Sequence, residues 1–175
     1  MMSFQKELKK REGPYERIVE WKTLANKNLD IILSMKIQMK FIFRWIAFNG
    51  LYSVSYEMDN GEKKAEKAQE WKKVEAFCDK FILTDKNLSS QIYSAEAKKI
   101  FFDNIKEKSN YMGKYLYDLK SARTKEEQAK YLVMIAYKIR CRLFHGEKNP
   151  SLDANQLVVE TATKIINPIL NYVIT

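Results

Sequence analysis

Glycine and proline are scarce in this chain, which has five glycines and three prolines among 175 residues. A β-sheet protein of this length needs many tight turns, and these two residues supply much of the turn chemistry. Their scarcity predicts an all-α fold. Cysteine is also rare, and both cysteines, Cys78 and Cys141, fall in segments with helical apolar periodicity. Such positions are typical of reduced, packed thiols, although a bridge between the two stays open.

Long apolar runs are absent as well. The longest one, Phe41 to Phe48, is interrupted by Arg44 and is far shorter than the ~20 residues that a membrane-spanning helix needs. The N-terminus, Met1 to Arg11, is charged and no apolar block follows it, unlike a secretory signal. We therefore expect a protein without membrane segments that stays in the cytoplasm.

Several common catalytic motifs are missing. The chain has no glycine-rich loop of the GxxxxGK form, which cradles phosphates, and no GxSxG turn, which presents a nucleophilic serine. One histidine and two separated cysteines offer no recognisable spacing of metal ligands. The sequence predicts neither a metal nor a cofactor.

The composition is that of a globular protein, with 46% hydrophobic and 30% charged residues. Its length fits one domain spanning residues 1–175, in which residues 1–14 are expected to be a loosely ordered N-terminal segment. The net charge of +9 favours polyanionic partners such as RNA, DNA or an acidic protein. Most charges are nevertheless interspersed, as on an ordinary solvated helix face.

Apolar residues at helical spacing predict a series of helices. The first follows Gly13-Pro14 and breaks near residues 26–30. The longest pattern continues across Asn49-Gly50, so we expect no hairpin turn at that pair. Asn60-Gly61 ends it. A charged helix over residues 63–83 and several short helices over residues 87–120 complete this part.

Two sequences of the capping-box type mark the last two helices. In Thr124-Lys-Glu-Glu127 the hydroxyl and the carboxylate can satisfy free amides at a helix start. The helix that it opens should end at Gly146, because glycine adopts the left-handed conformation without steric cost. Asp153 to Gln156 is a second such sequence and opens the last helix, which Pro168 should kink or end.

The candidate for chemistry is the end of the penultimate helix. Four cations and the only histidine lie within eleven residues there. They are Lys138, Arg140, Arg142, His145 and Lys148. Arg140 and His145 are about 1.4 helical turns apart, so both could reach one phosphate if the last turn loosens before Gly146. A helix C-terminus also favours a protonated imidazole, which suits a group that exchanges protons near neutral pH.

This segment resembles a known family. Arg140-x4-His145, in Ile-Arg-Cys-Arg-Leu-Phe-His-Gly, is similar to the Arg-x4-6-His signature of HEPN domains. A second stretch, Arg44-Trp-Ile-Ala-Phe-Asn-Gly-Leu-Tyr52, resembles the motif on a long early helix in several HEPN subfamilies. The resemblance implies a helical bundle with a long early helix and a final antiparallel helix pair. It also implies a homodimeric, metal-independent ribonuclease of toxin-antitoxin or phage-defence systems, which a cognate antitoxin or regulatory protein can restrain.

The resemblance also implies roles for single residues. His145 would take the proton from a ribose 2′-hydroxyl, and Arg140 would stabilise charge on the phosphate. Arg142, Lys138 and Lys148 are further residues expected to contact RNA. Cys141, Arg44 and Asn49 are expected to lie behind the catalytic pair and to hold it in position.

The alternative hypothesis is a protein that has the HEPN-like fold but no catalytic activity. Many active family members have a polar residue directly after the arginine, where this chain has Cys141. The alternative is therefore an inactive module that binds RNA or protein. On the long helix, packing explains Arg44, Asn49 and Tyr52 better than direct catalysis does. The three tryptophans, Trp21, Trp45 and Trp71, are expected in the core.

Overall fold

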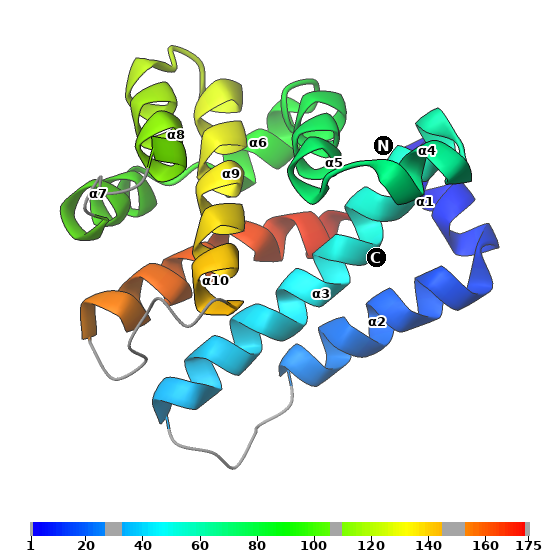
Figure 1. The fold of residues 1–175 in the computed structure, drawn as a ribbon, viewed down its shortest axis with the longest axis horizontal. Coiled ribbons are helices and arrows are strands. Elements are labelled where there is room, and N and C mark those ends of the chain that lie inside the picture. Colours follow the sequence, from blue (N-terminus) through cyan, green and yellow to red (C-terminus); the bar gives the residue numbers. More distant parts are fainter. Residues whose placement is uncertain (1, 27–32, 106–109, 145–152, 174–175) are drawn as a thin grey trace.

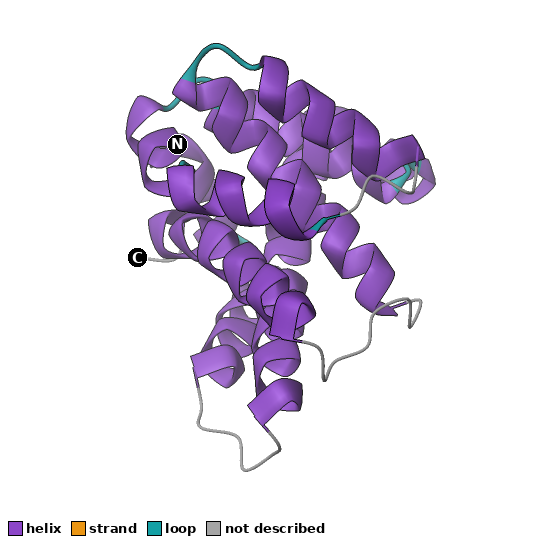
Figure 2. Ribbon diagram, turned by 90° about the vertical axis from the view of Figure 1, so that its left-hand side faces the viewer, coloured by secondary structure: helices purple, strands orange, loops and turns teal. Residues whose placement is uncertain are grey.

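The computed structural model describes residues 2–26, 33–105, 110–144 and 153–173, and within these ranges the chain forms helices joined by short turns and no strand (Figure 1, Figure 2). The prediction of an all-α fold is confirmed. None of the described helices is both long enough and apolar enough to cross a membrane. The helices are α1 (Met2–Lys10), α2 (Glu12–Asn26), α3 (Leu33–Asn60), α4 (Glu62–Lys67), α5 (Glu70–Phe77), the π-helical turn η1 (Cys78–Ile82), α6 (Lys86–Ile92), α7 (Ala95–Asn104), α8 (Asn110–Ser121), α9 (Lys125–Phe144) and α10 (Asp153–Val173).

The longest described helix, α3, has 28 residues and lies antiparallel to α2 (Figure 1). It passes through Asn49-Gly50 without a break, as predicted from its continuous periodicity. It ends at Asn60, also as predicted, and Gly61 follows with a φ of 80°. This left-handed conformation favours glycine because a Cβ would be strained there.

Gly50 faces Ile18 of α2, and we expect the Gly50→Ala variant to be less stable. A Cβ at position 50 would lie 2.9 Å from Cδ1 of Ile18 and closer still to Cγ1. Ile18 is buried and β-branched, so it has few rotamers with which to move away. The expected loss in the free energy of unfolding is about 1–3 kcal/mol, although alanine is the better helix former.

Urea denaturation measures this loss. Gly113→Ala in α8 is the matched control, because a Cβ there meets no atom within 4 Å. That variant should gain stability from helix propensity alone. An equal gain in both variants would show that α2 moves freely to accept the methyl group.

The core is built around α9. Its residues 132–136 are completely buried, including those on opposite faces of the helix. A fully buried run of this kind requires neighbours on all sides, and α9 packs against α5, α6, α8 and α10.

An aromatic cluster joins α3, α5 and α9. Trp45 is 5.3 Å from Phe48 and 6.0 Å from Tyr137, measured between ring centroids. Phe48 is in turn 5.1 Å from Tyr52 and 5.2 Å from Phe77 of α5. The three contacts of Phe48 are edge-on and the Trp45–Tyr137 contact is tilted. Edge-on contacts stabilise aromatic pairs beyond the area they bury. The cluster holds in place the three helices that carry the candidate site.

The final helix pair differs from the expected antiparallel arrangement. Figure 1 shows α8 beside α9, whereas α10 crosses α9. The packing of α10 explains this, because its contacts with α3 are more extensive than those with α9.

Residues 1–14, expected to be a loosely ordered N-terminal segment, contain a described helix and the start of the next one. Residues 2–10 form α1, and α2 begins at Glu12. Phe4 and Leu8 are buried, and the ring of Phe4 lies 5.0 Å from that of Phe81. These two residues form an apolar i, i+4 pair within a charged segment, and burial of that pair holds the helix on the core.

One predicted helix differs in its bounds, and one of two expectations for Pro168 is excluded. The charged helix expected over residues 63–83 is divided, because Ala68 and Gln69 adopt extended backbone conformations between α4 and α5. Pro168 was expected to kink or end the last helix; the helix does not end there but continues to Val173, and a kink stays a prediction. Burial on both sides of the proline offsets the hydrogen bond that it removes. The buried side chains there are Ile165, Ile166, Ile169, Leu170 and Val173.

The capping box at Thr124 is confirmed. The amide of Glu127 donates to the Thr124 hydroxyl at 3.1 Å, and the Glu127 carboxylate accepts from the Thr124 amide at 3.1 Å. The hydrogen bonds that the carboxylate accepts from the Thr124 and Arg123 amides lower the pKa of Glu127. The second predicted start also agrees, since α10 begins at Asp153. Gly146, the expected end of α9, lies outside the described residues.

Candidate functional site

Arg140 lies near the C-terminal end of α9 and forms an ion pair with Glu70 of α5. The distance between Arg140 Nη1 and Glu70 Oε2 is 2.9 Å, and the two side chains are 22% and 29% exposed. The guanidinium also lies 4.5 Å from the ring centroid of Phe144, one helical turn further along. Arg140 is therefore held from two sides at the border between core and solvent.

The other oxygen of Glu70 binds Tyr52 of α3. The Tyr52 hydroxyl donates to Glu70 Oε1 at 2.5 Å, and the ring of Tyr52 is completely buried. Burial raises the pKa of Tyr52 above its ordinary range, and the hydrogen bond to Glu70 raises it further. Tyr52 is therefore a neutral hydrogen-bond donor that fixes the carboxylate. We call Tyr52, Glu70 and Arg140 the carboxylate network.

The break between α4 and α5 positions Glu70. Gln69 has φ and ψ of −63° and 142°, an extended conformation from which α5 begins at Glu70. A carboxylate in the first turn of a helix is stabilised by the free amides there. Had the helix continued through Ala68 and Gln69, the direction of Glu70 would have been set by α4 instead.

Both stretches that resemble the HEPN motifs meet at this site. Trp45 and Tyr52 of the early helix lie against α9 through the Trp45–Tyr137 ring contact and through Glu70. From the sequence, Tyr52 was expected to pack on the long helix. It is indeed buried, but its hydroxyl belongs to the carboxylate network.

The two residues expected to support the site from α3 point elsewhere. Arg44 directs Nη1 to the backbone oxygen of Ala25 at 3.4 Å, and burial lowers its pKa. Asn49 accepts a hydrogen bond from Ser53 at 3.0 Å and lines a groove along α2. Arg44 and Asn49 leave the helix in directions different from that of Tyr52, since each residue turns the helix by about 100°.

The remaining predicted residues are near Arg140 in the chain. Lys138 lies 5.2 Å from the ring centroid of Tyr137. Cys141 is half-buried and hydrogen-bonded to Tyr137, whose pKa is raised by burial and then by this bond. Arg142 is half-buried. His145 and Lys148 lie outside the described residues.

A groove adjoins the carboxylate network. It has a volume of about 490 Å³ and lies between α5, α8 and α9. Trp71, expected in the core, is 37% exposed at this groove. The residues that line it are Gln69, Glu70, Trp71, Lys114, Tyr115, Tyr137 and Lys138.

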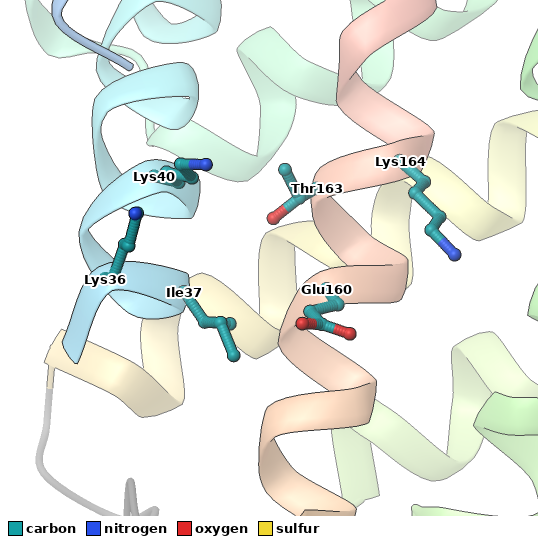
Figure 3. A pocket seen from close by; sticks show the side chains of 6 residues that line it. All are labelled: Lys36, Ile37, Lys40, Glu160, Thr163 and Lys164. Carbon is teal, nitrogen blue, oxygen red and sulfur yellow. The ribbon is translucent and has the colours of Figure 1, made fainter. Parts of the chain in front are cut away.

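A second groove, of about 460 Å³, lies between α3 and α10 (Figure 3). Lys36, Ile37 and Lys40 of α3 face Thr163 and Glu160 of α10 across it, whereas Lys164 points away. The described residues that line it include three lysines and one carboxylate but no aromatic ring.

Glu70 is the functional candidate that sequence reasoning missed. It stands among many charged residues in the segment that was predicted as a charged helix over residues 63–83. Its partners Tyr52 and Arg140 are 18 and 70 positions away. No local pattern relates residues at such separations, so only a packed structure could reveal this role.

Comparisons with known proteins leave the chain without an assigned family. No protein-family model matches it, and neither a curated protein nor a solved structure shows significant similarity to it.

Proposed function

We propose that the protein is a metal-independent endoribonuclease that acts as a toxin or phage-defence effector. The observation that carries the proposal is the fixed position of Arg140 beside a cationic, aromatic groove, five residues before the only histidine. The resemblance to HEPN domains supplies the reaction. The contact between α3 and α9 supports the resemblance, because it places the early motif and Arg140 next to the same site.

In the proposed reaction the imidazole of His145 accepts the proton of a ribose 2′-hydroxyl, and the 2′-oxygen attacks the adjacent phosphorus. The bond between phosphorus and the 5′-oxygen breaks, and this oxygen receives a proton. The products carry a 2′,3′-cyclic phosphate and a 5′-hydroxyl. Arg140 donates N–H groups to the phosphate oxygens on which negative charge develops. A homodimer would supply one His145 as the base and a second as the acid.

The ion pair with Glu70 is compatible with this role. A guanidinium has five N–H donors in a fixed plane, and Glu70 engages one terminal nitrogen. Nε of Arg140 is buried and has no acceptor among the described residues. Glu70, itself held by Tyr52, keeps the guanidinium in one orientation, which reduces the reorganisation needed in the transition state.

The same ion pair favours a second candidate function. Glu70 neutralises much of the Arg140 charge, and Cys141 follows Arg140 where active relatives of the resembled family often have a polar residue. The alternative is an inactive module that binds RNA or a protein partner such as an antitoxin. This candidate predicts binding without cleavage.

Cleavage assays in EDTA distinguish the two candidates. We expect the purified protein to cleave RNA without added metal and to leave 2′,3′-cyclic phosphate ends, which phosphatase-dependent labelling and mass spectrometry detect. His145→Gln should lose this activity because an amide cannot accept the proton. Loss of cleavage on 2′-deoxy substitution at the cut site would identify the nucleophile. Intact RNA for structured, unstructured and transfer RNAs alike would contradict the proposal.

A further inference from the structure

The groove beside the carboxylate network combines aromatic rings with cations. Trp71 of α5 exposes 37% of its surface there, although burying a tryptophan is favourable. Lys114 and Tyr115 come from α8, and Tyr137 and Lys138 from α9. Rings and charges lie close together in this lining, since the Lys138 ammonium is 5.2 Å from the ring centroid of Tyr137.

The charges of the groove are cationic on balance. Its two lysines are opposed by Glu70, whose carboxylate already pairs with Arg140 and accepts from Tyr52. The phenols are neutral at physiological pH, as tyrosines ordinarily are, and burial raises the pKa of Tyr115 to about 12 and also raises that of Tyr137. A ligand therefore meets two ammonium groups and uncharged rings.

We propose that this groove binds single-stranded RNA, with an unpaired base stacked on Trp71 and the backbone phosphates near Lys114 and Lys138. Stacking on aromatic side chains together with a positively charged path is the way in which proteins bind single strands. A duplex hides the faces of its bases, so it cannot use Trp71. An acidic peptide could pair with the lysines but would leave the exposed indole without a partner.

The inference rests on the proposed function, because it makes the groove the path that leads a strand to Arg140. Glu70 links the two: it lines the groove and holds the guanidinium at 2.9 Å. A phosphate that follows the base bound at Trp71 would then approach Arg140. The substrate class is unpaired RNA, and the expected cleavage lies in loops or ends rather than within helices.

Fluorescence anisotropy with a 2′-O-methylated single strand tests binding apart from cleavage, because the methyl group blocks the nucleophile. We expect Trp71→Ala to weaken binding about tenfold, the lower part of the range for loss of one stacked base. The double variant Lys114→Ala/Lys138→Ala should reduce the slope of log Kd against log salt by about 1.4, as expected when two phosphate contacts to a single strand are lost. A duplex of the same sequence should bind the wild type more weakly than the single strand.

Two matched controls separate this groove from general electrostatics. Lys36→Ala/Lys40→Ala removes the same charge from the groove between α3 and α10 (Figure 3). Tyr117→Ala removes an aromatic ring that is 67% exposed on α8 but does not line the groove. Both should leave binding nearly unchanged. Equal losses in the control and groove variants would overturn the inference.

The outcomes distinguish the inference from the proposed function. Groove-dependent binding without cleavage of any natural RNA would support the groove and contradict the ribonuclease. Cleavage that is unaffected by Trp71→Ala and by the lysine variants would support the ribonuclease and contradict the role of the groove. Tighter binding of an acidic peptide, or of a duplex, than of the single strand would assign the groove to another partner and overturn the inference.

Discussion

Arg140→Ala is expected to lower the single-turnover rate of RNA cleavage by about 10²–10³-fold, the usual effect of removing one donor that stabilises transition-state charge. The fall should appear mainly in the rate of the chemical step and little in the KM, since the donor acts on charge that develops during the reaction. Arg140→Lys keeps a positive charge but loses the planar fork of donors, so it should recover only part of the rate.

Arg140→Ala should lower the free energy of unfolding only moderately. Glu70 keeps its hydrogen bond from Tyr52, and the ion pair is partly exposed. Its loss should therefore cost less than the roughly 3–5 kcal/mol seen when a fully buried pair is broken. Arg17→Ala, on an exposed position of α2, is the matched control and should cleave at the wild-type rate. A folded Arg140→Ala protein with undiminished cleavage would exclude Arg140 from the reaction.

Trp45→Ala should cause the largest loss of stability, about 3–5 kcal/mol, which is the usual cost of removing a large buried aromatic side chain. Trp45 is 1% exposed, and its ring contacts Phe41, Phe48, Tyr52 and Tyr137. A loss of this size is a large share of the roughly 5–15 kcal/mol that stabilises a typical domain.

Urea unfolding followed by circular dichroism measures the effect of Trp45→Ala. Trp71→Ala is the matched control, because its side chain is 37% exposed and should contribute much less. Trp45→Phe should fall between the two, since it keeps a ring in the cluster. Similar losses for Trp45→Ala and Trp71→Ala would mean that the aromatic cluster does not hold α3 to α9.

Local signals predicted much of the fold. The capping box at Thr124, the continuity of α3 through Asn49-Gly50 and the end at Asn60 were readable because each depends on residues within a few positions. Local signals say less where the burial of side chains stabilises a helix. α1 is held by Phe4 and Leu8 on the core, and α10 continues past Pro168 because the surrounding side chains are buried.

For the candidate site, composition and spacing identified the cation-rich end of α9. They did not identify Glu70, which forms the ion pair with Arg140. They also placed Arg44 and Asn49 near that site, whereas both side chains are directed toward α2 or their own helix. Trp71 was expected inside, yet it is exposed at the groove. Periodicity indicates which residues share a helix face, but it does not say which neighbouring helix covers that face.

The amino-acid sequence alone determined the helical class, the run of α3 and the concentration of charge between Lys138 and Lys148, because short-range spacing and propensity decide these features. Only the tertiary structure decided that Glu70 joins Tyr52 to Arg140 and that a groove opens beside them. The hydrogen-bonded atoms belong to three helices whose packing is set by the whole core, so no stretch of the chain encodes their meeting by itself.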